Sequence, residues 1–522
     1  MKKALLLFAI LLCTLKADAQ FTFQKAIGYT GSDDAHCIVQ TTDGGYVMCG
    51  VTDSVLGNTS SSNNLYVVKV NNAGHIQWSR VFDSLGLGNS IIQTTDGGYV
   101  ILPSDDRFSL LKLDNGGNVQ WMKSIAAGYA GRAYDIIQTA DGGFAACGVC
   151  PQIVGAGLDV FVMKLDAGGN LQWARAIGGP NNDYGHAIIQ TLDGDLAIAG
   201  KTQSFGTAGD VNFYVLKLSG TGALKWAKTI GGPYGDEGRD IVQNADGSLA
   251  VCGMAYSFNT IGTTDIYVVK LDINGNLLWN RVINRHIQYS FDDANSIIAT
   301  ADGGFVVGGT NMIFGPGGDV FYLAKLDAQG NFVWGTSVGG SGSEWGRAFA
   351  KTNDQGFIAC GNTTSFNYNK PNIYIIKYDQ LGYTCGSITR EGSAQNVSGV
   401  IDSGGSTISS TATLLAHPAP SGHPGGGVDD LCNTAGIHEL GAARPQVFPN
   451  PFSGQTTIAL SAPIQNGTLT LYNSVGQIVS RQEHVSGRSF VIRQEDLPTG
   501  MYSLRVFQEN NLIAQERIII QP

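Results

Sequence analysis

Acidic residues recur at one position along this chain, and carboxylates at a repeated spacing could bind a cation or act as a catalytic pair. They stand before similar apolar segments at Asp33, Asp183, Asp236, Asp292 and Glu344. A catalytic pair is needed only once, whereas a carboxylate that caps a loop is needed in every repeat. The recurrence therefore favours loop capping, and a calcium site is the alternative.

The next position carries side chains of different chemistry in different repeats. It holds Trp345 and Tyr184 in two of them, and the acids Asp34, Glu237 and Asp293 in three others. A position whose chemistry varies is not required by the fold. We therefore predict that Trp345 and Tyr184 contact a ligand.

The cysteines divide into two groups. Four of them lie six residues after a turn aspartate, at a position that holds Leu, Ala or Gly in other repeats: Cys49, Cys147, Cys252 and Cys360. Such a position is a packing site, so these four are expected to be buried thiols. Cys385 and Cys432 instead flank a polar segment, and we predict that they form a disulfide in an oxidising compartment.

Histidines and known catalytic motifs indicate no further site. His36 and His186 share a column with Arg239 and Arg347, which argues against a metal site or a catalytic triad. The sequence has no Gly-x-Ser-x-Gly elbow, no His-Glu-x-x-His pair and no phosphate loop. We predict no catalytic residue, no metal and no cofactor.

These residues belong to seven repeats that run from residue 20 to residue 385. Tryptophans spaced by 43 to 55 residues mark six of them, each four residues after a glycine: Trp78, Trp121, Trp173, Trp226, Trp279 and Trp334. An Asp-Gly-Gly turn or a near variant and a lysine occur seven times, as in Asp141 and Lys164, and divide each repeat into four short strands. Four strands in about 50 residues predict a seven-bladed β-propeller.

The chain ends indicate how the ring closes. The seventh repeat lacks its tryptophan strand, and residues 23–28 match residues 173–178 position for position. We predict that this N-terminal strand pairs beside the strand that ends at Lys377, which protects an open sheet edge. The tryptophan strand is expected to be outermost, and each lysine is expected to form an exposed ion pair with its turn aspartate.

The repeats resemble those of secreted β-propeller proteins of Bacteroidetes. The motif Asp166-x-x-Gly169-x-x-x-Trp173 is also similar to the tryptophan-docking motif of quinoprotein dehydrogenases. Those enzymes typically have eight blades and a vicinal cysteine pair, whereas the nearest approach here is Cys147-x-x-Cys150. The resemblance therefore implies the fold, and no quinone is expected.

Beyond the repeats the composition changes twice. Residues 386–440 are rich in Ser, Thr, Gly, Ala and Pro, which predicts a linker. Residues 441–522 contain Val447-Phe448-Pro449-Asn450-Pro451-Phe452 and Leu497-Pro498-Thr499-Gly500-Met501-Tyr502, and resemble the type A sorting domain of the type IX secretion system. The resemblance implies a small β-sandwich that engages that machinery and is usually removed at the cell surface or on release.

The N-terminus indicates export, and the net charge bears on the partner. Met1-Lys2-Lys3, an apolar run to Leu12 and Ala17-Asp18-Ala19 predict a signal peptide over residues 1–19. A net charge of −10 argues against a nucleic-acid partner, and no later apolar run is long enough to span a bilayer.

We therefore expect an all-β secreted or surface-attached binding protein whose propeller face contacts a glycan or a protein. The alternative is a secreted polysaccharide hydrolase or lyase that uses carboxylates on that face.

Overall fold

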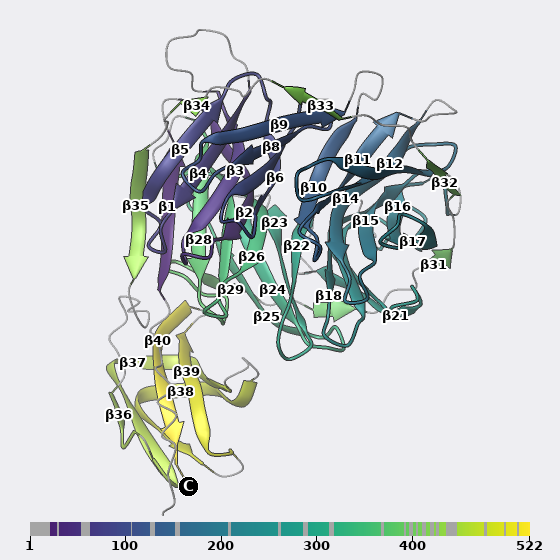
Figure 1. Cartoon of the computed structure of the whole chain (residues 1–522). Coiled ribbons are helices and arrows are strands. Elements are labelled where there is room, and N and C mark those ends of the chain that lie inside the picture. The colour runs from purple at the N-terminus through teal and green to yellow at the C-terminus, as the bar shows by residue number, and fades with distance from the viewer. Residues whose placement is uncertain are drawn as a thin grey trace, which may run out of the picture.

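The computed structural model describes residues 21–521 apart from several short segments. These segments are 29–30, 54–62, 106, 126–130, 152–156, 207–209, 259–262, 285–290, 313–317, 367–369, 391–392, 396–399, 403–405, 410–413, 418–421, 424–426, 435–445, 451, 474–477, 495–496 and 509–510. The predicted signal peptide lies outside the described residues. The described chain is all-β, with a propeller and a smaller C-terminal β domain (Figure 1).

Seven antiparallel sheets form the blades, and each contains four strands from the repeats. Blades 1 to 3 consist of β2 (Asp33–Gln40), β3 (Tyr46–Thr52), β4 (Asn64–Val70), β5 (Ile76–Phe82); β6 (Gly88–Gln93), β7 (Tyr99–Pro103), β8 (Leu110–Leu113), β9 (Val119–Ile125); and β10 (Arg132–Gln138), β11 (Phe144–Pro151), β12 (Leu158–Leu165), β13 (Leu171–Gly178).

Blades 4 to 6 repeat the arrangement. They consist of β14 (Asp183–Gln190), β15 (Leu196–Thr202), β16 (Asn212–Leu218), β17 (Leu224–Gly231); β18 (Asp236–Gln243), β19 (Leu249–Ala255), β20 (Asp265–Leu271), β21 (Leu277–Asn284); and β22 (Phe291–Ala299), β23 (Phe305–Met312), β24 (Val320–Leu326), β25 (Phe332–Val338). Blade 7 contains β26 (Glu344–Lys351), β27 (Phe357–Thr363), β28 (Asn372–Tyr378) and the N-terminal β1 (Thr22–Gly28).

The predicted closure is confirmed. β1 pairs antiparallel with β28, with Phe23 opposite Lys377. In the other blades the tryptophan rests on a glycine of the next blade, as Trp78 rests on Gly117, where a Cβ would lie 2.9 Å from the indole. The side chains of Phe23 and Lys25 cover Gly74 in the same way. The N-terminal strand therefore supplies both the missing sheet edge and the missing ring of blade 7.

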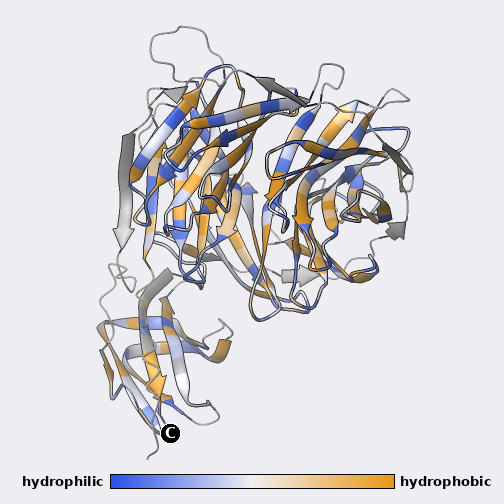
Figure 2. Cartoon of the chain, in the orientation of Figure 1, coloured by the Kyte–Doolittle hydropathy of each residue, from blue (hydrophilic) through white to orange (hydrophobic). Residues whose placement is uncertain are grey.

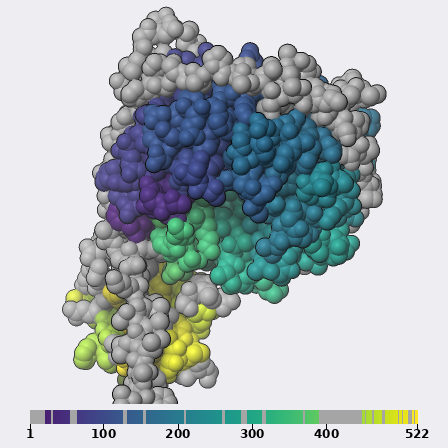
Figure 3. All heavy atoms as spheres, in the orientation of Figure 1, coloured from purple at the N-terminus to yellow at the C-terminus, as the bar shows by residue number. Residues whose placement is uncertain are grey.

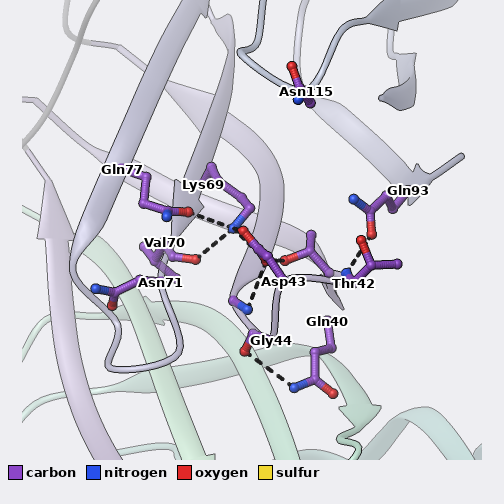
Figure 4. A network of polar contacts seen from close by, with 12 residues as sticks. Gln40, Thr42, Asp43, Gly44, Lys69, Val70, Asn71, Gln77, Gln93 and Asn115 are labelled. Atoms are coloured by element: carbon purple, nitrogen blue, oxygen red, sulfur yellow. Dashed lines mark hydrogen bonds and ion pairs between the residues drawn. The ribbon is translucent and has the colours of Figure 1, made fainter. Parts of the chain in front are cut away.

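The predicted lysine–aspartate columns are confirmed in all seven blades. The Nζ-to-carboxylate distances run from 2.6 to 3.5 Å. The expectation of exposed pairs is wrong for the lysines, whose side chains are only 3–7% exposed, while the aspartates are 30–60% exposed. In four blades the buried ammonium also donates to the carbonyl of the following residue, as Lys69 does to Val70, and this bond offsets part of the cost of its burial (Figure 4).

The turns at this end of the blades also join neighbouring blades. The N–H of Thr42 donates to Oε1 of Gln93 in the next blade, at 2.8 Å (Figure 4). The same contact closes the ring, because the N–H of Asn353 in blade 7 donates to Gln40 of blade 1 at 2.7 Å. Six of the turns place a glycine at positive φ, and blade 7 has Gln355 there, with φ of 66°.

The segment predicted as a linker adds a fifth strand to every blade. We call residues 388–434 the belt. Its strands pair with the outer strands of blades 6, 5, 4, 3, 2, 1 and 7 in that order, through β29 (Ile388–Arg390), β30 (Ser393–Gln395), β31 (Val400–Asp402), β32 (Ser406–Ser409), β33 (Leu414–His417), β34 (Gly422–His423) and β35 (Gly427–Thr434). The belt has the polar composition of a linker and yet is paired with the propeller. This is possible because strands this short are held mainly by backbone hydrogen bonds to open sheet edges and need no apolar core.

Hydrophobic cores lie between adjacent blades. The strands of the blades carry the apolar residues, and polar residues concentrate at the turns (Figure 2). The four cysteines of the packing column are buried free thiols, as predicted. Packing between blades therefore stabilises the ring, with the tryptophan contacts on its outer side.

The C-terminal domain has its own core. It contains β36 (Gln446–Phe448), β37 (Gln455–Tyr472), β38 (Ile478–Arg493), β39 (Gly500–Gln508) and β40 (Asn511–Ile520). The sheet order is β36-β37-β39-β40, with β38 paired to β37. Leu471, Leu504 and Ile518 are among its buried residues. It forms a smaller body beside the propeller (Figure 3).

Candidate functional site

The innermost strand of each blade begins at one end of the ring, opposite the Asp-Gly turns. The recurring carboxylates stand at this start and are buried. Asp183 accepts hydrogen bonds from the N–H of Gly179 at 2.8 Å and the hydroxyl of Ser204 at 2.7 Å. Glu344 accepts hydrogen bonds from the N–H of Gly340 and the hydroxyl of Thr363, both at 2.8 Å. These contacts support loop capping for the column.

A β-bulge follows in every innermost strand. The bulge falls three residues after the position of the recurring carboxylate. The residues at the bulge are His36, Asn89, Tyr134, His186, Arg239, Asn295 and Arg347. A bulge re-aims its side chain, and several of these side chains reach the next blade. Asn89 donates to the carbonyl of Ala133 at 2.6 Å, and Asn295 donates to that of Gly346 at 2.7 Å.

The bulge residues, together with the column two residues earlier that contains Tyr184 and Trp345, form what we call the rim. Sequence analysis identified the rim residues of the earlier column and missed the bulge column. The available signal was the mixture of His, Asn, Tyr and Arg at one repeat position.

Trp345 lies on the rim at the second residue of β26 and is 43% exposed. Its indole Nε1 donates to a carboxylate oxygen of Asp319. The guanidinium of Arg347 lies 5.4 Å from the centre of its ring. The indole is therefore held in one orientation while a large part of it stays accessible.

Tyr184 lies at the equivalent position of β14, in an aromatic group. The imidazole of His186 stands 5.9 Å from its ring and 5.5 Å from that of Tyr134 in the preceding blade. Lys201 places its ammonium 4.8 Å from the centre of the Tyr184 ring. Nδ1 of His186 donates to the carbonyl of Gly238 at 2.8 Å, and burial lowers the pKa of this imidazole, which favours its neutral form.

Ion pairs link the rim acids to rim bases. Asp34 contacts Arg347 across the closure of the ring at 3.1 Å, and Arg239 contacts Asp293 at 3.2 Å. Glu237 contacts Lys201 at 3.0 Å. Burial by itself would raise the pKa values of Asp34 and Glu237, but these neighbouring bases and histidines lower both below their usual range. The rim is therefore a charge-balanced surface of fixed polar groups.

Two further acids lie deeper, one residue past the bulge. Asp135 accepts the N–H of Ile188 in the next blade at 2.9 Å, and Asp240 accepts that of Ile297 at 2.8 Å. Burial raises the pKa of Asp240 to about 7, with a smaller contribution from the charge of Asp135. Both carboxyls are engaged in joining adjacent blades.

The two predicted disulfide cysteines lie close together along blade 7. Cys385 is disulfide-bonded in the structure. The belt ends beside β1, where Cys432 is the register partner of Gln24, and the amide of Gln24 donates to the carbonyl of Cys385. The side chain of Cys432 lies outside the described set, so the pairing of the two cysteines stays a prediction.

The described part of the chain has no group of three or more His, Cys, Asp or Glu residues arranged to hold a metal ion. Among the same residues, no helix is long and apolar enough to cross a membrane.

Several solved structures are similar to this chain at low identity. The polysaccharide lyase Uly1 has 12% identity and a TM-score of 0.44, over 66% of this chain and 90% of that one. A protein of unknown function from Dyadobacter fermentans has 10% identity and a TM-score of 0.41, over 70% and 99%. Another from Bacteroides caccae has 13% identity and a TM-score of 0.33, over 52% and 90%. At these values they say nothing about what this chain does.

No curated protein matches the chain by sequence. Residues 446–521 match the family described as a secretion system C-terminal sorting domain. They are the residues that form the separate C-terminal β domain, and they include the motifs that resemble the type A domain. The chain therefore carries a C-terminal sorting domain that engages the type IX secretion machinery and directs export to the cell surface or the extracellular space.

Proposed function

We propose that this exported protein binds a glycan on the rim of its propeller, with Trp345 and Tyr184 as stacking platforms. The observation that carries the proposal is the indole of Trp345, which is exposed yet held by Asp319 and Arg347. A fixed aromatic face loses little conformational entropy on binding, and it can stack on the C–H face of a pyranose ring.

The rim chemistry favours hydrogen bonding over net charge. Rim acids such as Asp34 and Glu237 are paired with bases, so a ligand meets amides, carboxylates and guanidinium groups that are already held in place. Such a surface suits the hydroxyl groups of a neutral sugar. Tyr184 belongs to blade 4 and Trp345 to blade 7, so a ligand that contacts both has to cross the ring and is expected to be an extended oligosaccharide.

The alternative, a polysaccharide hydrolase or lyase that uses carboxylates on the propeller face, receives less support, most clearly for a hydrolase. A glycosidase needs one carboxylic acid that stays protonated near neutral pH, beside a second that is ionised. The pKa values of Asp34 and Glu237 are lowered, which removes either as that acid. The carboxyls with raised pKa, such as Asp236 and Asp240, are occupied by hydrogen bonds within the fold.

Screening the mature chain on a glycan array, with turnover assays on each hit, tests the proposal. Trp345→Ala should weaken binding of a hit about tenfold or more, as expected for an aromatic hot spot. Tyr234→Ala is the matched control, because Tyr234 is 61% exposed outside the rim and its contacts with Ser257 use backbone atoms. Equal affinity of Trp345→Ala and wild type would refute the proposed platform.

A further inference from the structure

The turn before the outer strand of each blade varies in sequence, and in blade 7 this turn carries a tyrosine where the sorting domain approaches. In four blades this turn ends in an asparagine whose side chain donates to the aspartate four residues earlier at 2.7–3.0 Å, namely Asn118, Asn170, Asn276 and Asn331. Blades 1 and 4 have His75 and Ala223 there. Blade 7 has Tyr383 at this position. Its backbone keeps the turn, since the N–H of Tyr383 donates to Asp379 at 2.8 Å.

The ring of Tyr383 contacts the sorting domain. The guanidinium carbon of Arg505, on β39, lies 3.6 Å from the centre of the Tyr383 ring and 4.7 Å from that of Tyr472, on β37. Arg505 is 2% exposed. Its Nε and Nη2 have no hydrogen-bond partner among the described residues. The two aromatic rings, together with a hydrogen bond to the side chain of Tyr472, therefore compensate for burying this cation.

Other contacts agree with this placement. β29, the first strand of the belt, is in contact with β40 of the sorting domain (Figure 1). A guanidinium desolvated against two aromatic rings is among the stronger cation–π arrangements. If the two domains separated, water would reach Arg505, and its contact with the ring of Tyr383 would be lost.

We propose that the sorting domain docks on its own propeller through a clamp in which Arg505 inserts between Tyr472 and Tyr383. The docking surface is assembled by ring closure. The residues that follow Tyr383 are tied to β1, because Thr384 and Cys385 bond to Phe23 and Gln24. A propeller that has not closed does not hold Tyr383 in place, so docking depends on a completed ring. This inference is independent of the proposed glycan binding.

The test uses small-angle X-ray scattering of the chain without its predicted signal peptide and with the sorting domain retained. Tyr383→Asn introduces the residue that four other blades already carry, so the turn is retained and only the docking ring is removed. We expect the undocked fraction to rise about tenfold or more, with a larger radius of gyration. Asn170→Tyr, which makes the reverse exchange in blade 3, is the matched control and should leave the scattering unchanged.

Arg505→Lys gives a second perturbation from the other side, since an ammonium lacks the planar group that stacks between two rings. It should produce the same extended scattering as Tyr383→Asn, with no additive effect in the double variant. Scattering of Tyr383→Asn identical to wild type would overturn the clamp. So would a wild-type chain that is already fully extended.

Discussion

The buried lysine of each blade predicts an asymmetric response to mutation, which blade 3 can test. Nζ of Lys164 donates to both oxygens of Asp141, at 3.1 and 2.8 Å, and to the carbonyl of Leu165 at 3.0 Å. The lysine side chain is 7% exposed and the aspartate 57%. Removing Asp141 therefore leaves a buried ammonium without its counter-charge, whereas removing Lys164 leaves a carboxylate that water can solvate.

The magnitude follows from the carboxyl pKa. The hydrogen bond from Lys164 is the largest cause that lowers the pKa of Asp141 from 3.8 to about 2, and each tenfold change in acid dissociation is worth ~1.4 kcal/mol. Asp141 is about half exposed, and solvent screening therefore reduces the contribution of the ion pair to the free energy of unfolding to about 1 kcal/mol. Asp141→Asn should therefore cost about 1–2 kcal/mol, and Lys164→Met, which also removes the buried charge, less than about 1 kcal/mol.

Urea unfolding followed by tryptophan fluorescence measures both variants. All seven tryptophans lie between residues 78 and 345, so the signal reports the propeller and not the sorting domain. Because the folded pKa is depressed, the stabilisation by Asp141 is present above pH ~4 and is lost as the pH falls toward ~2. The difference between wild type and Asp141→Asn should shrink over that window. A Lys164→Met variant less stable than Asp141→Asn would refute the reasoning.

Three other predictions concern closure and local strain. Gln355→Gly should stabilise the propeller by about 1 kcal/mol in the same urea assay, because a left-handed φ strains a residue with a side chain; a lower midpoint would contradict this. Phe23→Ala should cost about 3–5 kcal/mol, since Phe23 is fully buried; a loss below ~1 kcal/mol would show that the N-terminal strand does not secure blade 7. Non-reducing mass spectrometry of the secreted chain should find Cys385 linked to Cys432, and alkylation of either thiol before reduction would exclude that bridge.

The repeat architecture could be predicted because a propeller blade is built from local contacts. Each hairpin leaves its own signal, and the signal recurs seven times. The match of residues 23–28 to the tryptophan strand was enough to predict the closure between β1 and β28. The pairing of Lys164 with Asp141 could also be predicted. Antiparallel pairing places the end of the strand that carries Lys164 beside the start of the strand that follows Asp141.

The tertiary structure decided the features that depend on neighbours distant in sequence. The belt strands are short and are held by backbone hydrogen bonds, which leave no side-chain pattern to find. The burial of Lys164 depends on a carbonyl and on packing that the repeat does not encode as a motif. The rim arises because a bulge in each innermost strand turns residues such as His186 toward the next blade. The contact between Tyr383 and Arg505 joins two domains, and the two residues lie 122 positions apart in the sequence. Neither residue by itself gives a sequence signal that would predict the contact.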